Sequence, residues 1–489
     1  MPVLAIDAGT TGVTALVVGE QGDVLARGYR EFAQLFPRPG WVEHEPDDIW
    51  TATVAACREA LAASEVEPTC VGITDQRETA VVWDRRTLRS PRPAIVWQDR
   101  RTTGICDRLR ADEAHVSQLT GLRLDPYFTG TKFAWLAEHE PQLWSGVRDG
   151  GLALGTVDSY VIARLTGGAA HVTDPSNASR TLLYDLEKGA WSDELCDLFD
   201  VPRSALPEVV PSSGVVGTTD PDAFLGLSLP IAGIAGDQQA ALFGQACYFP
   251  GMSKCTYGTG SFVLTNTGTS PVRSDAGLLT TVAWDIGDGL VYALEGSIFV
   301  TGAAVQWLRD GLGVIGSAGE IEALAASVPD SGDVVFVPAL TGLGAPDWDP
   351  HARGAIVGIT RGTTRAHLAR ATLEAIAFEV RDVVDVMVSE AGLDVPELSA
   401  DGGASANDLL LQLQADQLGV PVRRPQVTET TALGAAFLAG LGTGVWGSTD
   451  ELAQTWALDR RFEPEDGRRD DGRYGRWQEA VRRSGGWTS

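Results

Sequence analysis

The sequence predicts an α/β protein with two domains. Its 489 residues are more than one compact core usually organises. Short β-rich runs alternate with helical patterns along the whole chain. A strand, a turn of Gly and Thr and a second strand open the chain, and the same order returns near residue 257. We therefore expect one domain over residues 1–246 and another over residues 247–489, with the two turns facing each other across a cleft.

The first half contains one clear helix and several short strands. Residues 45–64 predict a helix, because Pro46 suits a first helical turn and apolar residues recur at helical spacing. Residues 231–246 predict a strand that ends at Gly236-Asp237 and continues as a helix. Three β-rich runs predict a buried sheet, over residues 70–76, 79–84 and 94–99.

The second half repeats this alternation. Residues 254–268 predict a strand, a Gly-Thr turn and a strand. A long helix over residues 364–392 is expected to stop at Gly392. The remaining expected elements are strands over residues 334–340 and 354–360 and a strand–turn–helix over residues 398–419.

The composition excludes several classes of function. The net charge of −27 repels nucleic-acid backbones and anionic membranes, so no nucleic-acid partner is expected. No apolar run reaches about 18 residues and no basic segment precedes the first apolar run, so we expect neither a membrane span nor a signal peptide. The six cysteines lack metal-binding spacing, which predicts buried free thiols in a reducing cytoplasm and no structural zinc. The six histidines are expected to be structural or exposed.

The opening turn, DAGTTG over residues 7–12, has the parts of a phosphate site. Its glycines expose backbone N–H groups and its threonines add two hydroxyls, which together can hold an anion. It is not a P-loop, because neither a Lys-Ser/Thr pair nor a helix follows. Asp7, at the end of the strand, can hold Mg²⁺ through water. The alternative is a tight hairpin with an Asx-type turn.

Asp237 lies where a predicted strand meets a predicted helix. A carboxylate at such a junction can accept a proton from an alcohol as a general base. Alternatively, it caps a helix that begins at about residue 239. The acids Asp7 and Asp237, with the two Gly-Thr turns, indicate phosphoryl transfer, a reaction that depends on positioning and charge neutralisation.

Arg77-Glu78 follows another predicted strand and can bind a vicinal diol, since Arg donates hydrogen bonds and Glu accepts them. The alternative is a surface ion pair. Trp97, Tyr127 and Phe262 can pack on a small carbon skeleton or belong to the core. The stretch DGGASAN predicts a glycine turn where a base or ribose can approach the backbone, although many α/β turns share this pattern.

Many separated segments match one known family. Two long stretches match its signatures, YFTGTKFAWLAEH and GAIVGITRGTTRAHLARATLE. Further matching segments are DAGTTG, GWVEHEP, GITDQRET, AIVWQDRRT, HVTDPSNASRT, GIAGDQQAALFGQAC, TYGTGSF, GAAVQWLRDGLG, GLGAPDWDPHARGAIVGIT, DGGASAND and VTETTALGAA. Nearly end to end, the chain resembles the FGGY carbohydrate kinases, and within that family the glycerol kinases.

The resemblance implies two actin-like ATPase domains of the ribonuclease H-like type with the active site in the cleft between them. It implies cytoplasmic, ATP- and Mg²⁺-dependent phosphorylation of glycerol, or a similar small polyol, to sn-glycerol 3-phosphate by a homodimer or homotetramer. Asp237 is the implied general base and, with Asp7, the implied metal ligand. The implied polyol-binding residues are Arg77, Glu78, Trp97, Tyr127, Asp237, Gln238 and Phe262. The implied ATP-binding residues are Gly9, Thr10, Thr11, Gly12, Thr259, Gly260, Gly302, Gln306, Gly403, Ala404 and Asn407.

The sequence departs from the family pattern at several positions, of which Thr14, Gly344 and Asp347 are examples. Thr14 stands where the family usually has Arg or Lys, so a positive charge that would face the phosphates is missing. Within the same fold, the alternative is a kinase for another polyol or a ketose. The alternative from another class is a non-catalytic actin-like nucleotide-binding protein, against which Asp237, Arg77 and Glu78 argue.

Overall fold

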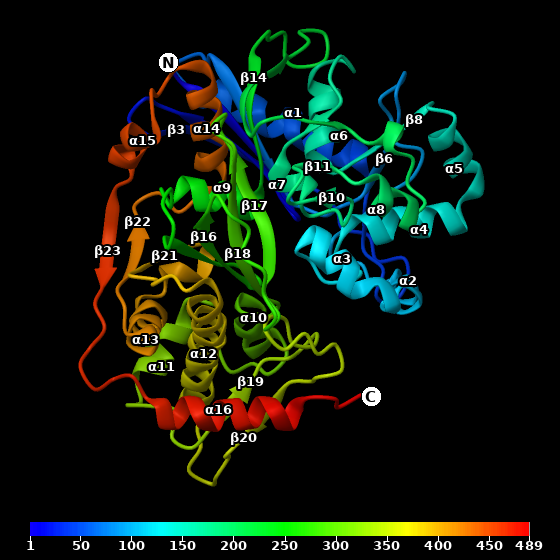
Figure 1. The fold of residues 1–489 in the computed structure, drawn as a ribbon. Coiled ribbons are helices and arrows are strands. Elements are labelled where there is room, and N and C mark those ends of the chain that lie inside the picture. Colours follow the sequence, from blue (N-terminus) through cyan, green and yellow to red (C-terminus); the bar gives the residue numbers. More distant parts are fainter. Residues whose placement is uncertain (489) are drawn as a thin grey trace.

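The computed structural model describes residues 1–488 and contains two large sheets, one in each half of the chain (Figure 1). The first sheet has the strand order β13 (Ser213–Thr218), β14 (Pro230–Gly236), β5 (Cys70–Asp75), β1 (Val3–Ala8), β2 (Gly12–Val18) and β3 (Val24–Glu31). The second has the order β17 (Leu279–Asp285), β18 (Leu290–Ile298), β16 (Ser261–Gly268), β15 (Ser253–Tyr257), β21 (Leu398–Asp401), β22 (Val422–Pro425) and β23 (Leu458–Phe462). The predicted α/β class is confirmed.

The two sheets repeat one strand pattern. In the first sheet β1, β5 and β14 are parallel, and β2 and β3 continue antiparallel beyond β1. In the second, β15, β21 and β22 are parallel, and β16 and β18 continue antiparallel beyond β15. The two Gly-Thr hairpins therefore occupy equivalent places in the two sheets. Each hairpin joins the first parallel strand of its sheet to the antiparallel strand beside it.

Two helices join the halves into one core. Helix α14 (Thr430–Thr443) packs on the first sheet and crosses α9 (Asp237–Gly244), which in turn packs on β15 and β16 of the second sheet. The helices meet backbone to backbone, since a Cβ on Gly434 would lie only 1.8 Å from the carbonyl oxygen of Ala240. Because α14 belongs to the second half yet covers the first sheet, the domain limit at residue 246 stays a prediction.

The outer faces of both sheets are covered by helices that bury apolar stripes. Helices α1 (Pro46–Ala63) and α6 (Val157–Leu165) share one apolar cluster with the first sheet. Helices α12 (Arg365–Ala391) and α13 (Asp408–Leu418) cover the second sheet in the lower part of Figure 1. The sequence predicted α1 and α12 within one or two residues, and Gly392 ends α12 in the left-handed conformation at φ 61°.

One prediction about the first half is wrong. Of the three β-rich runs expected to form a buried sheet, only residues 70–75 enter the first sheet, as β5. The chain reverses after β5, where Glu78 takes a positive φ of 61°. Strand β6 (Val81–Asp84) then pairs with β8 (Leu152–Gly155), and β7 is only Ala94–Ile95, paired with β4 (Glu43–His44).

The remaining elements are short or lie at the edges of the two halves. Strands β19 (Val335–Val337) and β20 (Ala355–Val357), both predicted, pair only with each other. The other elements used below are α4 (Thr129–His139), α7 (Pro175–Ala178), α10 (Gly302–Asp310), α11 (Glu320–Ala326) and α16 (Asp471–Ser484).

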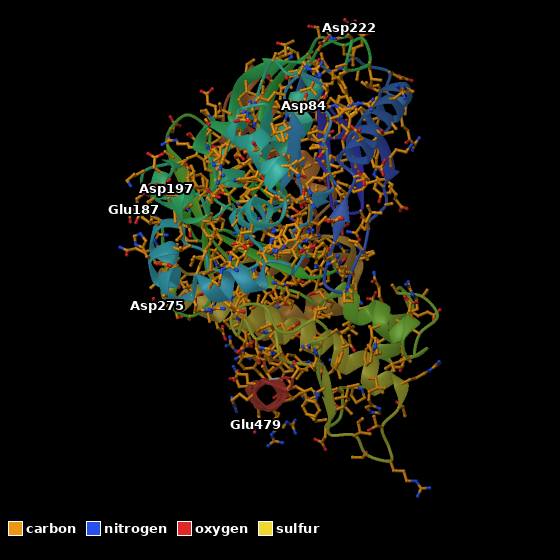
Figure 2. All side chains as sticks on the ribbon, turned by 90° about the vertical axis from the view of Figure 1, so that its right-hand side faces the viewer. Asp84, Glu187, Asp197, Asp222, Asp275 and Glu479 are labelled. Atoms are coloured by element: carbon orange, nitrogen blue, oxygen red, sulfur yellow. The ribbon has the colours of Figure 1, made fainter. Side chains whose placement is uncertain are left out.

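Acidic side chains are spread along the length of the molecule. Figure 2 shows acidic side chains from Asp222 at one end of the molecule to Glu479 at the other, so the negative charge is not gathered in one segment. All six cysteines are buried and unpaired, as predicted. Over residues 1–488 no helix combines the length and the apolar character needed to cross a bilayer.

Candidate active site

The candidate site lies where the three parallel strands of the first sheet end. Ala8 of β1 and Gly236 of β14 both pair with Asp75 of β5, so the carboxyl ends of these strands share one edge. Asp7, the pair Arg77-Glu78 and Asp237 therefore converge there from three different segments. Such an edge is where open α/β sheets bind their ligands.

Asp237 is the first residue of α9 and keeps contact with solvent. Its side chain is 28% exposed, and one carboxylate oxygen lies 3.1 Å from Nε of Arg77. The same oxygen accepts a hydrogen bond from the backbone N–H of Gln238 at 2.7 Å. The N-cap position belongs to Gly236, so the predicted capping of a helix starting near residue 239 is wrong by two residues. Asp237 is thus held in place by an arginine while its carboxylate stays accessible.

Arg77 and Glu78 are buried rather than superficial. Each is 2% exposed, so the alternative of a surface ion pair is wrong. Arg77 makes a bidentate contact with Glu295, with N–O distances of 2.5 and 3.1 Å. Arg180 bridges the two acids, donating from Nε to Glu78 at 2.7 Å and from Nη2 to Glu295 at 2.9 Å. Two arginines and two glutamates thus form a closed, buried network directly beside Asp237.

The pKa shifts of Arg77 and Glu295 favour their charged forms, whereas burial raises the pKa of Glu78. Burial opposes the charge of Arg77, but Glu295 and Glu78 hold its pKa well above the ordinary value. Burial likewise opposes the charge of Glu295, yet Arg180 and Arg77 lower its pKa to about 2. A buried charge persists when its partners are close and directional, which is the case here.

Three aromatic side chains surround the charged groups. The indole N–H of Trp97 donates to the hydroxyl of Thr10 in the opening turn at 2.9 Å. Trp97 and Tyr127 meet edge to face, with ring centroids 5.6 Å apart. The guanidinium carbon of Arg77 lies 5.9 Å from the ring centroid of Phe262. These predicted residues are brought together and supply apolar walls beside polar partners.

Asp7 is the second carboxylate at this edge. Burial and the nearby charge of Asp237 raise the pKa of Asp7 to about 7. A buried acid whose pKa is raised by a neighbouring carboxylate suits a cation placed between the two groups. Within residues 1–488 no three His, Cys, Asp or Glu side chains are grouped so as to hold a metal. The protein therefore offers Mg²⁺ only two carboxylates here, and water and phosphate oxygens would supply the remaining ligands. This is how Mg²⁺ usually binds in phosphoryl-transfer sites.

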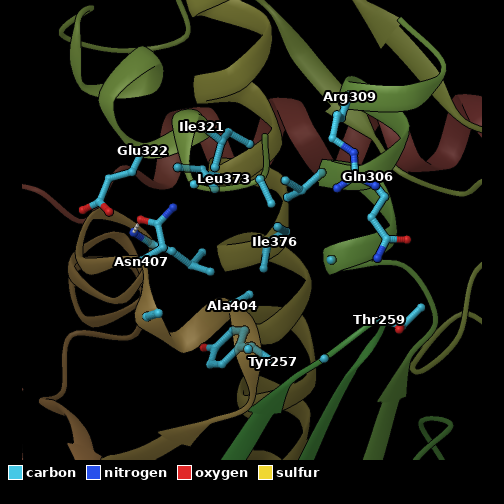
Figure 3. Close-up of a pocket in the computed structure, with 18 residues that line it drawn as sticks. Tyr257, Thr259, Gln306, Arg309, Ile321, Glu322, Leu373, Ile376, Ala404 and Asn407 are labelled. Carbon is cyan, nitrogen blue, oxygen red and sulfur yellow. Dashed lines mark hydrogen bonds between the residues drawn. The ribbon is translucent and has the colours of Figure 1, made fainter. Parts of the chain in front are cut away.

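A separate cavity of about 450 Å³ lies in the second half (Figure 3). Of the implied ATP-binding residues, the lining includes Thr259, Gly302, Gln306, Gly403, Ala404 and Asn407. It does not include Gly260 or the opening turn, Gly9 to Gly12, which lies in the first half. Most of the lining residues that sequence reasoning missed lie on the helices α10 to α13. They are the apolar Val305, Ile321, Leu373, Ile376 and Leu410, and the charged Arg309 and Glu322; Tyr257 at the end of β15 also lines the cavity.

Glycines let the backbone approach closely around this cavity. A Cβ on Gly302 would lie 2.6 Å from the carbonyl oxygen of Gly258, so α10 starts directly against the second Gly-Thr turn. The backbone N–H of Gly302 donates to that same oxygen at 3.0 Å. Gly403 faces open space, with no atom within 4 Å of an added Cβ. Asn407 caps α13 by accepting from the N–H of Leu410 at 2.9 Å, so it has a structural role as well.

Two models of one protein family match the two halves. The description "FGGY family of carbohydrate kinases, N-terminal domain" matches residues 2–244, and the corresponding C-terminal domain matches residues 253–443. The chain belongs to the FGGY family of carbohydrate kinases. Its family membership confirms the resemblance drawn from the sequence.

Curated relatives of this FGGY kinase are similar over their full length. "Glycerol kinase 2" of Thermotoga maritima is 53% identical, with 99% of each chain covered. "Glycerol kinase" of Aromatoleum aromaticum is 54% identical, covering 100% of this chain and 99% of its own. Among solved structures, Plasmodium falciparum glycerol kinase with ADP superposes with a TM-score of 0.91 at 34% identity, over 99% of this chain and 98% of its own.

Two residues of the charged network were missed by sequence reasoning. Glu295 is the only charged residue of the strand LVYALEGSI, which is otherwise apolar or small, and a lone acid in such a strand signals a buried partner. Arg180 lies in the matched segment HVTDPSNASRT without a motif of its own. No local pattern shows that these side chains meet, because their partners lie 102 to 218 positions away in the sequence.

Proposed function

We propose that this chain transfers the γ-phosphoryl group of ATP to a terminal hydroxyl of glycerol, with Asp237 as general base. The observation that carries the proposal is the geometry of Asp237: a partly exposed carboxylate 3.1 Å from a buried arginine, beside donors, acceptors and apolar rings that suit a three-carbon polyol. Full-length identity of 53% to 54% to proteins named glycerol kinase supports glycerol as the substrate.

In the proposed reaction, a terminal oxygen of glycerol attacks the γ-phosphorus in line as the bond to the β–γ bridging oxygen breaks. Asp237 accepts the proton of the attacking hydroxyl. Arg77 and Glu78 bind the polyol hydroxyls as donor and acceptor, and Trp97, Tyr127 and Phe262 line its carbon chain. The products are sn-glycerol 3-phosphate and ADP. Closure of the halves excludes water, which would otherwise hydrolyse ATP.

The phosphates are held from both halves in this proposal. Backbone N–H groups of the turns at residues 9–12 and 258–260 hold the β- and γ-phosphates. The adenosine occupies the 450 Å³ cavity of the second half. Asp7 and Asp237 would hold Mg²⁺, which when bound would supply positive charge to the phosphate oxygens. Thr14, the cross-strand partner of Asp7, brings no charge of its own.

Six buried, unpaired cysteines support a cytoplasmic location, where thiols stay reduced. A homodimer or homotetramer remains a prediction from the family.

The test is ADP release by the purified protein with ATP, Mg²⁺ and one of four compounds: glycerol, dihydroxyacetone, erythritol or xylulose. We expect the highest kcat/KM with glycerol and only background ADP release without a polyol. Turnover of another compound with none of glycerol would support a different polyol or ketose kinase. Nucleotide binding with no turnover of any compound would support the non-catalytic alternative.

A further inference from the structure

The buried network beside Asp237 is completed by a residue from the opposite half. Glu295 lies on β18 of the second sheet and is 0% exposed. Its two carboxylate oxygens accept from Arg77, Arg180 and the hydroxyl of Ser297. Arg77 and Arg180 both belong to the first half. The carboxylate of Glu295 thus connects two arginines of the first half to strand β18 of the second sheet.

We infer that Glu295 is a positioning residue for polyol binding, which acts through Arg77 and Arg180. This inference rests on the proposed function, because it concerns the same site. Glu295 contacts two nitrogens of Arg77 as a bidentate acceptor, and the third nitrogen, Nε, lies 3.1 Å from a carboxylate oxygen of Asp237. Arg180, held at its other end, fixes the carboxylate of Glu78. Both members of the polyol-binding pair are therefore oriented by one acid that does not itself line the cleft.

The surrounding contacts fix Glu295 relative to the first half. Its neighbouring strand β17 carries Thr281, whose hydroxyl meets that of Ser179 at 2.9 Å. The same hydroxyl accepts from the side-chain amide of Gln239 in α9 at 3.1 Å. Gln239 also accepts from Arg77 at 3.2 Å. Strand β17, α7 and α9 are thus packed together around the network, which links the two halves at this point.

Charge balance predicts what happens without Glu295. The two arginines would share only Glu78 and Asp237, and the guanidinium of Arg77 would turn toward those carboxylates. Hydroxyl groups of the substrate would then compete with protein acceptors for the same donors. Preorganised donors and acceptors set the affinity for a small polar ligand, so polyol binding should weaken while the remote nucleotide cavity is unaffected.

The test compares Glu295→Gln with Glu374→Gln. Glu374 in α12 is a matched control, since it is 7% exposed and also pairs with two arginines, Arg370 at 2.8 Å and Arg473 at 3.4 Å, away from the cleft. We expect E295Q to raise the KM for glycerol at least 30-fold with the KM for ATP within twofold of wild type. E374Q should lower the melting temperature similarly and leave both KM values within twofold.

A second variant, Arg180→Lys, tests the same inference if E295Q does not fold. Arg180→Lys keeps the positive charge but cannot reach both Glu78 and Glu295, and should raise the KM for glycerol about tenfold. Unchanged glycerol KM in both folded variants, or a fall in kcat alone, would overturn the inference. Failure of both variants to fold would also overturn it, because the network would then be structural. A wild-type protein inactive toward glycerol would instead refute the proposed function.

Discussion

At the proposed polyol end of the site, Arg77, Glu78, Arg180 and Glu295 are at most 2% exposed and hold one another through ion pairs. At the proposed nucleotide end, a cavity of about 450 Å³ is lined mainly by glycines and apolar side chains. A small polyol offers only hydroxyl groups, so its recognition needs donors and acceptors set in advance. An adenosine offers a large flat surface, which shape and close backbone approach can hold. Substitutions at the first end should therefore impair the reaction with glycerol, and substitutions at the second end should weaken nucleotide binding.

The largest effect is expected at Asp237. Asp237→Asn removes the proton acceptor but keeps the size of the side chain, so kcat should fall about 10³-fold, as for loss of a general base. The nucleotide cavity lies in the other half, so the Kd for ADP should stay within threefold. Steady-state kinetics and calorimetry measure the two quantities. Asp222→Asn, an exposed acid at the far end of the molecule, is the control and should have no effect (Figure 2).

Near-normal turnover by the Asn variant would remove Asp237 from the base role and leave the polyol end without a proton acceptor.

The nucleotide end is tested by Gly302→Ala. The added Cβ would lie 2.6 Å from the carbonyl oxygen of Gly258, so the start of α10 must move away from the Gly-Thr turn. Overpacking of this kind costs about 1–3 kcal/mol, and the same loss in ATP binding would raise the KM for ATP about 5-fold to 150-fold. Glycerol affinity should not change. Gly319→Ala is the matched control, because Gly319 lines the same cavity with no atom within 4 Å of an added Cβ.

An equal rise in the KM for ATP and the KM for glycerol in G302A would show that the two ends do not bind their ligands independently.

A pH effect on stability is expected from His44, next to the polyol end. This ring is fully buried and lies 3.3 Å from the side-chain amide of Gln76, and burial lowers its pKa from 6.5 to about 4. A base with a lowered pKa stays neutral in the folded state, so the unfolded state binds more protons between pH 6.5 and 4. Folding stability should fall as the pH drops through this window, by about 2 kcal/mol at pH 5.

Urea unfolding at pH 7 and pH 5 measures this loss. His44→Asn should reduce the difference between the two pH values, whereas His351→Asn, at an exposed histidine, should leave it as in wild type. An unchanged difference in the His44 variant would contradict the assignment.

The smallest effect is expected at Trp97. Trp97→Phe keeps the apolar wall but loses the hydrogen bond to Thr10, which is worth about 0.5–1.5 kcal/mol. The expected fall in kcat/KM for glycerol is about threefold to tenfold, measured by steady-state kinetics. A loss above 100-fold would mean that the indole N–H contacts the substrate or phosphate directly.

Much of the architecture could be predicted from the sequence, because its signals are local. Pro46 and Gly392 mark the ends of long helices, and the Gly-Thr turns mark the two opening hairpins. The short run at residues 94–99 was misjudged as a strand of the main sheet, since β-propensity does not reveal that the chain leaves the sheet at Glu78.

The site was predictable only where residues sit in motifs. Asp237 and the Arg77-Glu78 pair follow predicted strands, so their meeting could be anticipated. Glu295 and Arg180 could not be placed, because their partners come from distant segments and only the assembled sheets bring them together. The apolar lining of the nucleotide cavity was missed for the same reason: four helices contribute to it.

We expect Asp237 to face a polyol hydroxyl opposite the nucleotide. The decisive experiment is a crystal structure of the protein with glycerol and a non-hydrolysable ATP analogue. It should place a carboxylate oxygen of Asp237 within about 2.6–3.2 Å of a terminal glycerol oxygen, on the side facing the γ-phosphate. Glycerol bound elsewhere, or with that oxygen beyond reach of the carboxylate, would contradict this expectation.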